Sequence, residues 1–294
     1  MRTQNGSKQG EVMPEITTRH HEKIGLLAGA GRFPITFAAK ARSLGLPVVC
    51  VGIHDAAPPE LVDMVDRFYW TGIAKLGRMI RCFRREGVRR VVMAGKVKKS
   101  TMHSSWRWLR LIPDLRTIRF WFFRNRKDNR DDSLLLGIID EFAADGITFE
   151  SALDLCPELL VNAGILTKRR PSRSEEADIA FGWELAKEMG RLDVGQSVAV
   201  KEKAVLAVEA IEGTDRAIQR AGELCPKGDF TVIKVAKPQQ DMRFDVPTVG
   251  TTTIESLRRA GARVLAIEAG KTILLDAEET ISLADRYGLT IVAR

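Results

Sequence analysis

The chain has 294 residues, of which 45% are hydrophobic, so it is long enough for two domains with cores of their own. It carries 46 Lys and Arg against 38 Asp and Glu, and its four cysteines form no CxxC pair. This pattern excludes a zinc-ribbon protein and predicts free thiols in a reducing compartment. No apolar run approaches the roughly 18 residues of a membrane span. Residues 1–22 are polar, and we expect them to form a disordered tail of a cytoplasmic protein.

Strands alternate with helices in the first half of the chain. The sequence predicts strands at 24–29, 47–53 and 88–97, helices at 35–45, 76–87 and 131–146, and further helical periodicity at 151–160. Such alternation is typical of βαβ units with a parallel sheet. We therefore expect a Rossmann-like N-terminal domain over residues 23–168.

A basic, aromatic segment at 98–129 interrupts this alternation. Between Lys96 and Arg130 the chain has eleven Lys or Arg against two acids, so the formal charge of +8 originates here. Three of the five tryptophans, Trp106, Trp108 and Trp121, lie in the same stretch. Cations beside aromatic rings suit the cytoplasmic leaflet of a membrane, which is the favoured interpretation. An insertion that packs on the body and a nucleic-acid surface are the alternatives, and nucleic acid is the least favoured.

The second half has an alternation of its own. We expect Ser174 to begin a helix over 175–191. The other predicted elements are two short strands or a hairpin at 197–211, strands at 230–236, 263–269, 272–276 and 289–293, and helices at 214–222, 251–261 and 277–288. These elements predict a second, catalytic α/β domain over 169–294, with the ligand site in the crevice between the two domains.

Two motifs in the first half are candidates for phosphate binding. Gly29-Ala-Gly31 precedes Pro34 at the start of a helix, where small residues let a phosphate approach the backbone and the first N–H groups favour an anion. An ordinary strand-to-helix turn explains the same letters. Lys96 follows another strand, in a position from which it could reach the crevice of an α/β sheet. The alternative for Lys96 is a solvated side chain.

An acidic turn in the second half combines Glu212, Gly213, Thr214 and Asp215 where a strand gives way to a helix. Either Thr214 or Asp215 could simply cap that helix. The alternative is a site for a cation and a phosphate.

The loop after the 230–236 strand favours the second interpretation. It contains Gln239, Asp241, Arg243, Asp245 and Thr248 between two prolines. If the loop is extended, Asp241, Arg243 and Asp245 face one way. Carboxylates are ligands for Mg²⁺ and a guanidinium binds phosphate, although Asp–Arg ion pairs that stiffen the loop are an alternative.

Several motifs follow one another in a recognisable order, namely GAGRFP, MAGKV, DDSLL, NAGILT, AVEAIEGTDRAI, QDMRFDVPTVG and AGKT. With them, residues 23–294 resemble the UDP-2,3-diacylglucosamine pyrophosphatases of lipid A biosynthesis, of the two-domain type unrelated to calcineurin-like phosphoesterases. The resemblance implies a magnesium-dependent hydrolase of UDP-2,3-diacylglucosamine. Water would attack the α-phosphorus and release UMP and 2,3-diacylglucosamine 1-phosphate.

By the EGTD match, the resemblance implies that Asp215 is the catalytic aspartate. Glu212 and Asp241 are interpreted as its catalytic partners, and Asp215, Asp241 and Asp245 as ligands of Mg²⁺, with Mn²⁺ as the alternative metal. The residues expected to bind substrate are Gly29, Gly31, Pro34, Lys96, Thr214, Gln239, Arg243 and Thr248.

The expected partners are UDP-2,3-diacylglucosamine and the inner membrane, which residues 98–129 would contact peripherally, and a homodimer is an option. Two other functions stay open. One is a nucleotide-sugar or lipid binding protein without catalysis. The other is a nicotinamide-dependent oxidoreductase in which Asp55 holds a ribose.

Overall fold

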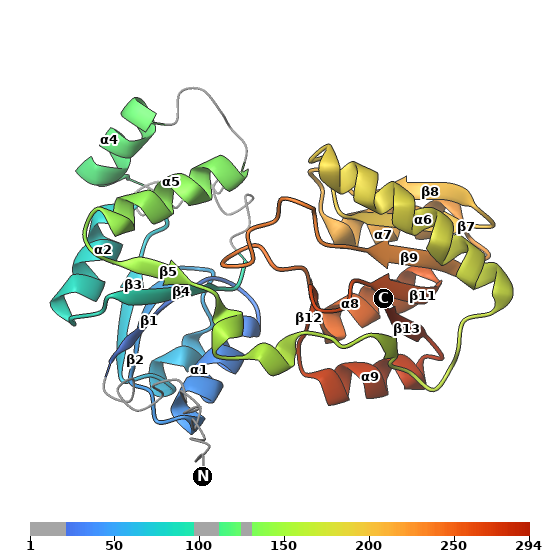
Figure 1. The fold of residues 1–294 in the computed structure, drawn as a ribbon, viewed down its shortest axis with the longest axis horizontal. Coiled ribbons are helices and arrows are strands. Elements are labelled where there is room, and N and C mark those ends of the chain that lie inside the picture. Colours follow the sequence, from blue (N-terminus) through green and yellow to red (C-terminus); the bar gives the residue numbers. More distant parts are fainter. Residues whose placement is uncertain (1–21, 97–111, 125–130) are drawn as a thin grey trace, which may run out of the picture.

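The computed structural model describes residues 22–96, 112–124 and 131–294, and these form two α/β domains (Figure 1). This confirms the predicted fold class. The expected tail at 1–22 lies outside the described residues except for Glu22, and only 112–124 of the segment at 98–129 is described. No helix of the described residues is long and apolar enough to cross a membrane.

The N-terminal domain is built on a parallel sheet with the strand order β3-β2-β1-β4-β5. Its strands are β1 (Ile24–Ala28), β2 (Val48–Ile53), β3 (Arg67–Thr71), β4 (Arg90–Ala94) and β5 (Thr148–Glu150). All six residues of β2, VVCVGI, are buried, as expected of a strand covered on both faces. The strand order reverses between β1 and β4, and ligands of open α/β sheets bind beyond the carboxyl ends of strands at such a point.

Helices cover both faces of this sheet. One face packs on α1 (Phe33–Ser43) and the 3₁₀ helix η1 (Pro59–Asp63), with Phe37 and Leu61 fully buried. The other face packs on α2 (Leu76–Arg85), α4 (Leu115–Arg124) and α5 (Asp131–Ala143). Phe120 of α4 is buried in this second core. Part of the basic segment therefore folds onto the body of the domain, as one of the alternatives for that segment expects.

The C-terminal domain has a mixed sheet with the order β6-β13-β11-β9-β7-β8. Its strands are β6 (Gly164–Ile165), β7 (Ser197–Lys201), β8 (Ala204–Val208), β9 (Phe230–Lys234), β11 (Ala262–Ile267) and β13 (Thr290–Ala293). β9, β11 and β13 are parallel, whereas β7 and β8 form the predicted hairpin and run antiparallel to their neighbours. A separate parallel pair joins β10 (Thr248–Val249) to β12 (Ile273–Leu274).

Four helices of the described residues sandwich this sheet. On one face lie α7 (Thr214–Leu224), α8 (Thr251–Ala260) and α9 (Ala277–Arg286), and on the other lies α6 (Arg173–Arg191). The predicted cap of α6 at Ser174 is wrong. Ser172 caps the helix instead, because its hydroxyl accepts from the Glu175 N–H while the Glu175 carboxylate accepts from the Ser172 N–H.

The connection between the domains contains two single-turn 3₁₀ helices, η3 (Ala152–Asp154) and η4 (Pro157–Leu159). The helical periodicity expected for 151–160 is thus not a continuous α-helix, since Pro157 supplies no N–H for one. Strand β6 already pairs with β13 in the second sheet. The change of domain therefore comes a few residues before the predicted boundary at 168/169.

Candidate functional site

Two of the phosphate-binding candidates in the N-terminal domain meet at the point where the strand order reverses. Ala30 and Lys96 form an antiparallel bridge just beyond β1 and β4, with N–H···O distances of 2.7 and 2.9 Å. Glycine is required for this contact, because a Cβ on Gly29 would lie 2.8 Å from the Lys96 carbonyl oxygen and one on Gly95 would lie 2.7 Å from that of Ala30. The close approach fixes Lys96 beside the glycine turn, where its side chain is exposed.

The remaining residues of the glycine turn prepare the start of α1. Gly31 has a φ of +102° and is exposed, and Pro34 lies in the first turn of the helix without losing a hydrogen bond. Arg32, between them, forms an ion pair across the domain boundary with Asp276, the residue before α9, at 2.9 Å.

The acidic turn does not cap its helix in the expected way. Gly213 is the N-cap of α7, and no side chain of the described ranges makes a capping hydrogen bond there, so capping by Thr214 or Asp215 is wrong. The Thr214 hydroxyl instead donates to Glu209 Oε1 at 2.9 Å. The second oxygen of the buried Glu209 carboxylate, Oε2, has no hydrogen-bond partner in the part of the chain that the structure describes. This leaves the first-turn N–H groups of α7 and one carboxylate oxygen without side-chain partners.

Lys234 lies at the centre of this arrangement, and sequence reasoning missed it. It is the last residue of β9 and only 4% exposed. Its ammonium group contacts the Thr214 hydroxyl at 3.4 Å and the Thr248 carbonyl oxygen at 3.3 Å. A signal was present in the sequence, because a lysine inside the apolar run FTVIKVA is out of place in a strand buried on both faces.

The charges around Lys234 identify its neighbours. Burial is the main reason that the pKa of Lys234 is lowered to about 8, and the positive charge of Lys96 lowers it further. The negative charges of Glu209, Asp215 and Asp245 act in the opposite direction. Lys96 belongs to the N-terminal domain and the other four to the C-terminal domain. Three residues predicted for the site, Lys96, Asp215 and Asp245, therefore act on a lysine that was not predicted.

Asp215 and Asp245 share a further property. Within the described chain, neither carboxylate has a hydrogen bond or an ion pair to another side chain, and Asp215 is exposed at the first turn of α7. Free carboxylates beside a buried ammonium group can bind a metal ion or orient a water molecule.

Asp241 is held differently. The loop is a turn at 241–245, closed by the Asp245 N–H on the Asp241 carbonyl at 3.0 Å, so the expected extended loop with Asp241, Arg243 and Asp245 facing one way is wrong. The Arg243 guanidinium donates to both oxygens of Asp241, at 2.6 Å for the shortest contact, and the Arg243 N–H donates to Oδ1 at 3.0 Å. These hydrogen bonds lower the pKa of Asp241.

Three other candidates also make contacts within the protein. Gln239 donates to the Gly190 carbonyl at the end of α6, at 3.1 Å. The Thr248 hydroxyl donates to the Val246 carbonyl at 3.0 Å. Glu212 Oε1 lies 3.0 Å from an Arg220 guanidinium nitrogen, an ion pair that lacks hydrogen-bond alignment.

The loop that carries these residues is anchored in the other domain. Phe244 packs against the core of the N-terminal domain on the α2 and α5 side of its sheet, and Ser151 donates to the Met242 carbonyl at 2.9 Å. In Figure 1 the loop leaves β9 and reaches toward the N-terminal sheet. Because Asp245 follows Phe244 directly, the anchor also fixes the position of that carboxylate.

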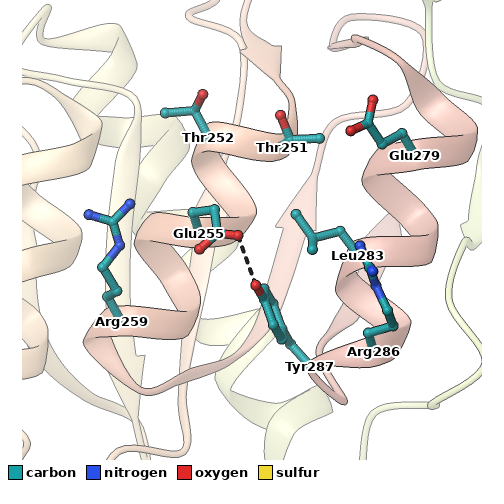
Figure 2. A pocket seen from close by; sticks show the side chains of 8 residues that line it. All are labelled: Thr251, Thr252, Glu255, Arg259, Glu279, Leu283, Arg286 and Tyr287. Atoms are coloured by element: carbon teal, nitrogen blue, oxygen red, sulfur yellow. Dashed lines mark hydrogen bonds between the residues drawn. The ribbon is translucent and has the colours of Figure 1, made fainter.

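A cavity of about 520 Å³ lies elsewhere, between α8 and α9. Figure 2 shows the Glu255–Tyr287 hydrogen bond of 2.8 Å at its centre, with Arg259 and Arg286 to either side. None of the residues predicted for the site lines it. Two glutamates and two arginines line it, so its formal charges balance, and we assign it no role.

Within the described ranges, no group of three or more His, Cys, Asp or Glu is assembled as a metal site. Asp215, Asp241 and Asp245 therefore do not form the three-ligand set expected from the sequence. An arrangement of one or two carboxylates completed by a ligand phosphate remains chemically suitable for Mg²⁺.

Comparison with known proteins supports the division into two domains. Residues 23–159 match the family model described as the LpxI N-terminal domain, and residues 162–292 match the LpxI C-terminal domain. The chain is 34% identical over 282 residues to "UDP-2,3-diacylglucosamine pyrophosphatase LpxI" of Caulobacter vibrioides, covering 92% of this chain and 96% of that protein.

Solved structures give only distant likenesses. The biotin carboxylase domain of the Hydrogenobacter thermophilus 2-oxoglutarate carboxylase matches at 15% identity and a TM-score of 0.27, over 70% of this chain and 41% of that one. A biotin carboxylase subunit of pyruvate carboxylase matches at 12% identity and the same TM-score, over 70% of this chain and 42% of that one. These values carry no argument about fold or function.

Proposed function

The chain belongs to the LpxI family, and on that premise we propose that it hydrolyses the pyrophosphate bond of UDP-2,3-diacylglucosamine in lipid A biosynthesis. The products are 2,3-diacylglucosamine 1-phosphate and UMP, formed when water attacks the α-phosphorus. The observation that carries the proposal is the similarity over nearly the full length to a relative that is named for this activity. The unpaired carboxylates of Asp215 and Asp245 beside Lys234 supply suitable chemistry.

Asp215 orients and deprotonates the attacking water. Its position in the first turn of α7 keeps the carboxylate exposed, and among the described residues no side chain pairs with either oxygen. Glu212 supports this turn through its ion pair with Arg220. Lys96 and the glycine turn at Gly29 and Gly31 receive the nucleotide phosphate at the carboxyl edge of the N-terminal sheet.

The residues present fit a magnesium ion bound through few protein ligands. Asp215 and Asp245 would hold it, together with phosphate oxygens of the substrate, and Asp241 would stabilise the loop through Arg243. Bound there, Mg²⁺ or Mn²⁺ would neutralise charge on the diphosphate. The buried Oε2 of Glu209, which has no hydrogen-bond partner among the described residues, could accept a hydrogen bond from a water molecule, either free or bound to the metal.

A lipid substrate requires access to a membrane, and α4 offers an apolar surface for it. Leu115, Trp121 and Phe122 are 86%, 53% and 58% exposed, although Phe120 on the same helix is buried in the core. Together with Arg119, which is exposed on the same helix, these side chains suit the interface of an anionic leaflet. We place the enzyme peripherally at the cytoplasmic face of the inner membrane. We also propose that it forms a homodimer, which light scattering of the purified protein tests.

The direct experiment incubates the purified full-length protein with UDP-2,3-diacylglucosamine and Mg²⁺ and measures UMP. We expect steady UMP release that Asp215→Asn lowers by about 100-fold or more, the scale of a lost general base. Glu223→Gln is the matched control, because this exposed acid lies on the same helix at its other end. Tight substrate binding without UMP release would favour a binding protein instead, and equal loss in both variants would remove the special role of Asp215.

A further inference from the structure

Lys234 is an unusual buried cation. Lysine is almost never fully buried without a partner of opposite charge. In the described residues, however, Lys234 forms no ion pair, and its ammonium group has only two long contacts, to Thr214 Oγ1 at 3.4 Å and to the Thr248 carbonyl at 3.3 Å. Typical N–H···O contacts are about 2.9 Å long. The three N–H donors of Lys234 are therefore poorly satisfied by the protein alone.

Lys187 in the same domain shows how the chain normally pairs a half-buried lysine. Its ammonium group contacts Glu268 Oε2 at 2.5 Å and donates to the Ala236 carbonyl at 3.3 Å. Glu268 in turn accepts from the Ala236 N–H at 2.9 Å. Lys187 is thus neutralised within the fold, whereas Lys234 is not in direct contact with any of the carboxylates whose charges act on it.

A second lysine, Lys96 of the other domain, acts on Lys234 through its charge. Lys96 is held beside the glycine turn by the bridge to Ala30, and its charge lowers the pKa of Lys234. Two cations held close together repel each other, and this repulsion is removed when an anion binds between them. The N-terminus of α7, which no side chain caps, adds partial positive charge next to Thr214.

The position also suits an anion that spans two sites. Lys96 follows β4 at the reversal of strand order in one sheet, and Lys234 ends β9 in the other. A single phosphate could be bound by either domain alone, but two cations supplied by two domains suit an anion with two charged groups. The carboxylates of Asp215 and Asp245 repel such an anion, and the ammonium groups offset that repulsion.

We propose that Lys234 and Lys96 form a clamp that binds the diphosphate of the substrate between the two domains, with Lys234 as a phosphate-binding residue from the C-terminal domain. This inference rests on the proposed function, since that function supplies the diphosphate. It assigns Lys234 to direct contact with substrate rather than to neutralising the neighbouring acids.

The test measures binding of inorganic pyrophosphate by calorimetry in buffer containing Mg²⁺, for the full chain and for Lys234→Met, Lys234→Arg and Lys96→Met. Met matches the shape of the lysine stem without its charge. We expect Lys234→Met and Lys96→Met each to weaken binding by about tenfold or more, as expected for a lost charge-assisted hydrogen bond, and Lys234→Arg to retain part of the affinity. Lys187→Met is the matched control and leaves the affinity unchanged.

A thermal melt separates binding from folding. If Lys234 binds an anion, Lys234→Met melts at the same temperature as the wild type or higher, because a poorly paired buried charge has been removed, whereas Lys187→Met melts lower. If Lys234 instead neutralises the acids, Lys234→Met melts lower while the folded protein binds pyrophosphate as the wild type does. That second result overturns the clamp.

Hydrolysis assays distinguish failure of the clamp from failure of the proposed function. If the wild type releases UMP and Lys234→Met releases it at the same rate, with a KM within about twofold, the clamp is overturned. The proposed function is then still supported. If pyrophosphate binding depends on Lys234 but the wild-type protein releases no UMP from UDP-2,3-diacylglucosamine, the clamp is supported and the proposed function is contradicted.

Discussion

At the scale of single residues, the site depends on which charges the fold pairs and which it leaves unpaired. Asp241 is bound on both oxygens by Arg243, whereas Asp215 and Asp245 have no side-chain partner within the described residues. Unpaired carboxylates next to the buried Lys234 are available to water and metal. A paired carboxylate mainly shapes its own loop.

The two aspartates of the loop therefore predict different effects on catalysis. Asp245→Asn is expected to lower kcat by about 100-fold, since it removes a free carboxylate from the site. Asp241→Asn removes one partner of a partly exposed ion pair and is expected to lower kcat by less than about tenfold. Initial rates of UMP release at saturating Mg²⁺ measure both. An Asp241→Asn defect as large as that of Asp245→Asn would show that Asp241 acts directly in the reaction.

The lowered pKa of Lys234 predicts how stability depends on pH. The folded protein binds a proton at Lys234 less readily than the unfolded chain, because the pKa falls from 10.5 to about 8. The buried charge therefore destabilises the folded state below pH 8, and this penalty diminishes as the pH rises from about 8 to 10.5. Lys234→Met removes the penalty, so its advantage in unfolding free energy over the wild type is larger at neutral pH than at higher pH.

Urea unfolding of wild type and Lys234→Met without metal, at neutral pH and above pH 9, measures this difference. The comparison between the two proteins cancels the titration of all other groups. An advantage of Lys234→Met that stays constant across this range would contradict the lowered pKa.

At the scale of elements, the loop between β9 and β10 connects the two domains to the site. Phe244 packs into the N-terminal core while Asp245, its neighbour, lies near Lys234. The same loop is tied down by the Ser151–Met242 hydrogen bond. A change in the anchor is therefore transmitted to a carboxylate of the site through one peptide unit.

Phe244→Ala is expected to lower both stability and turnover. The half-buried ring is expected to contribute roughly 2 kcal/mol, about half the cost of deleting a fully buried Phe. Turnover falls because Asp245 is no longer fixed, and Phe244→Leu, which keeps an apolar anchor, restores most of it. Phe181→Ala serves as the control, since this ring is exposed on α6. Normal turnover in folded Phe244→Ala would show that the anchor does not position the site.

The exposed face of α4 gives a separate expectation for lipid binding. Trp121→Ser combined with Phe122→Ser is expected to weaken binding to vesicles containing anionic lipid by about tenfold or more, because two large apolar groups are lost from the interface. Leu192→Ser with Leu224→Ser is the control, since both leucines are 62% exposed in the other domain. Vesicle sedimentation measures binding. Equal effects of the two pairs would remove the special role of α4.

At the scale of the whole molecule, the sequence predicted the helices and strands of each domain well, but it did not predict which residues of the two domains lie near each other. The alternation of apolar strands and amphipathic helices predicted both α/β domains, and the motifs predicted the family. The approach of Lys96 to Lys234 was not predictable, because it depends on how two sheets face each other across a domain boundary.

Local chemistry accounts for the specific errors. Asp241 was predicted to share a face with Asp245, but its carboxylate accepts from the Arg243 backbone N–H two residues on, which favours a turn over an extended loop. Capping by Thr214 or Asp215 was wrong because α7 begins earlier, with Gly213 as its N-cap, and the Thr214 hydroxyl donates to Glu209. Lys234 was overlooked because the apolar run around it was interpreted only as a strand.

The central claim is that water attacks the α-phosphorus of UDP-2,3-diacylglucosamine at the site formed around Lys234 and Asp215. Hydrolysis in water enriched in the heavy isotope of oxygen, followed by mass spectrometry of both products, tests it most directly. The account predicts one heavy oxygen atom in UMP and none in 2,3-diacylglucosamine 1-phosphate. Label in the sugar phosphate, or no hydrolysis at all, would contradict it.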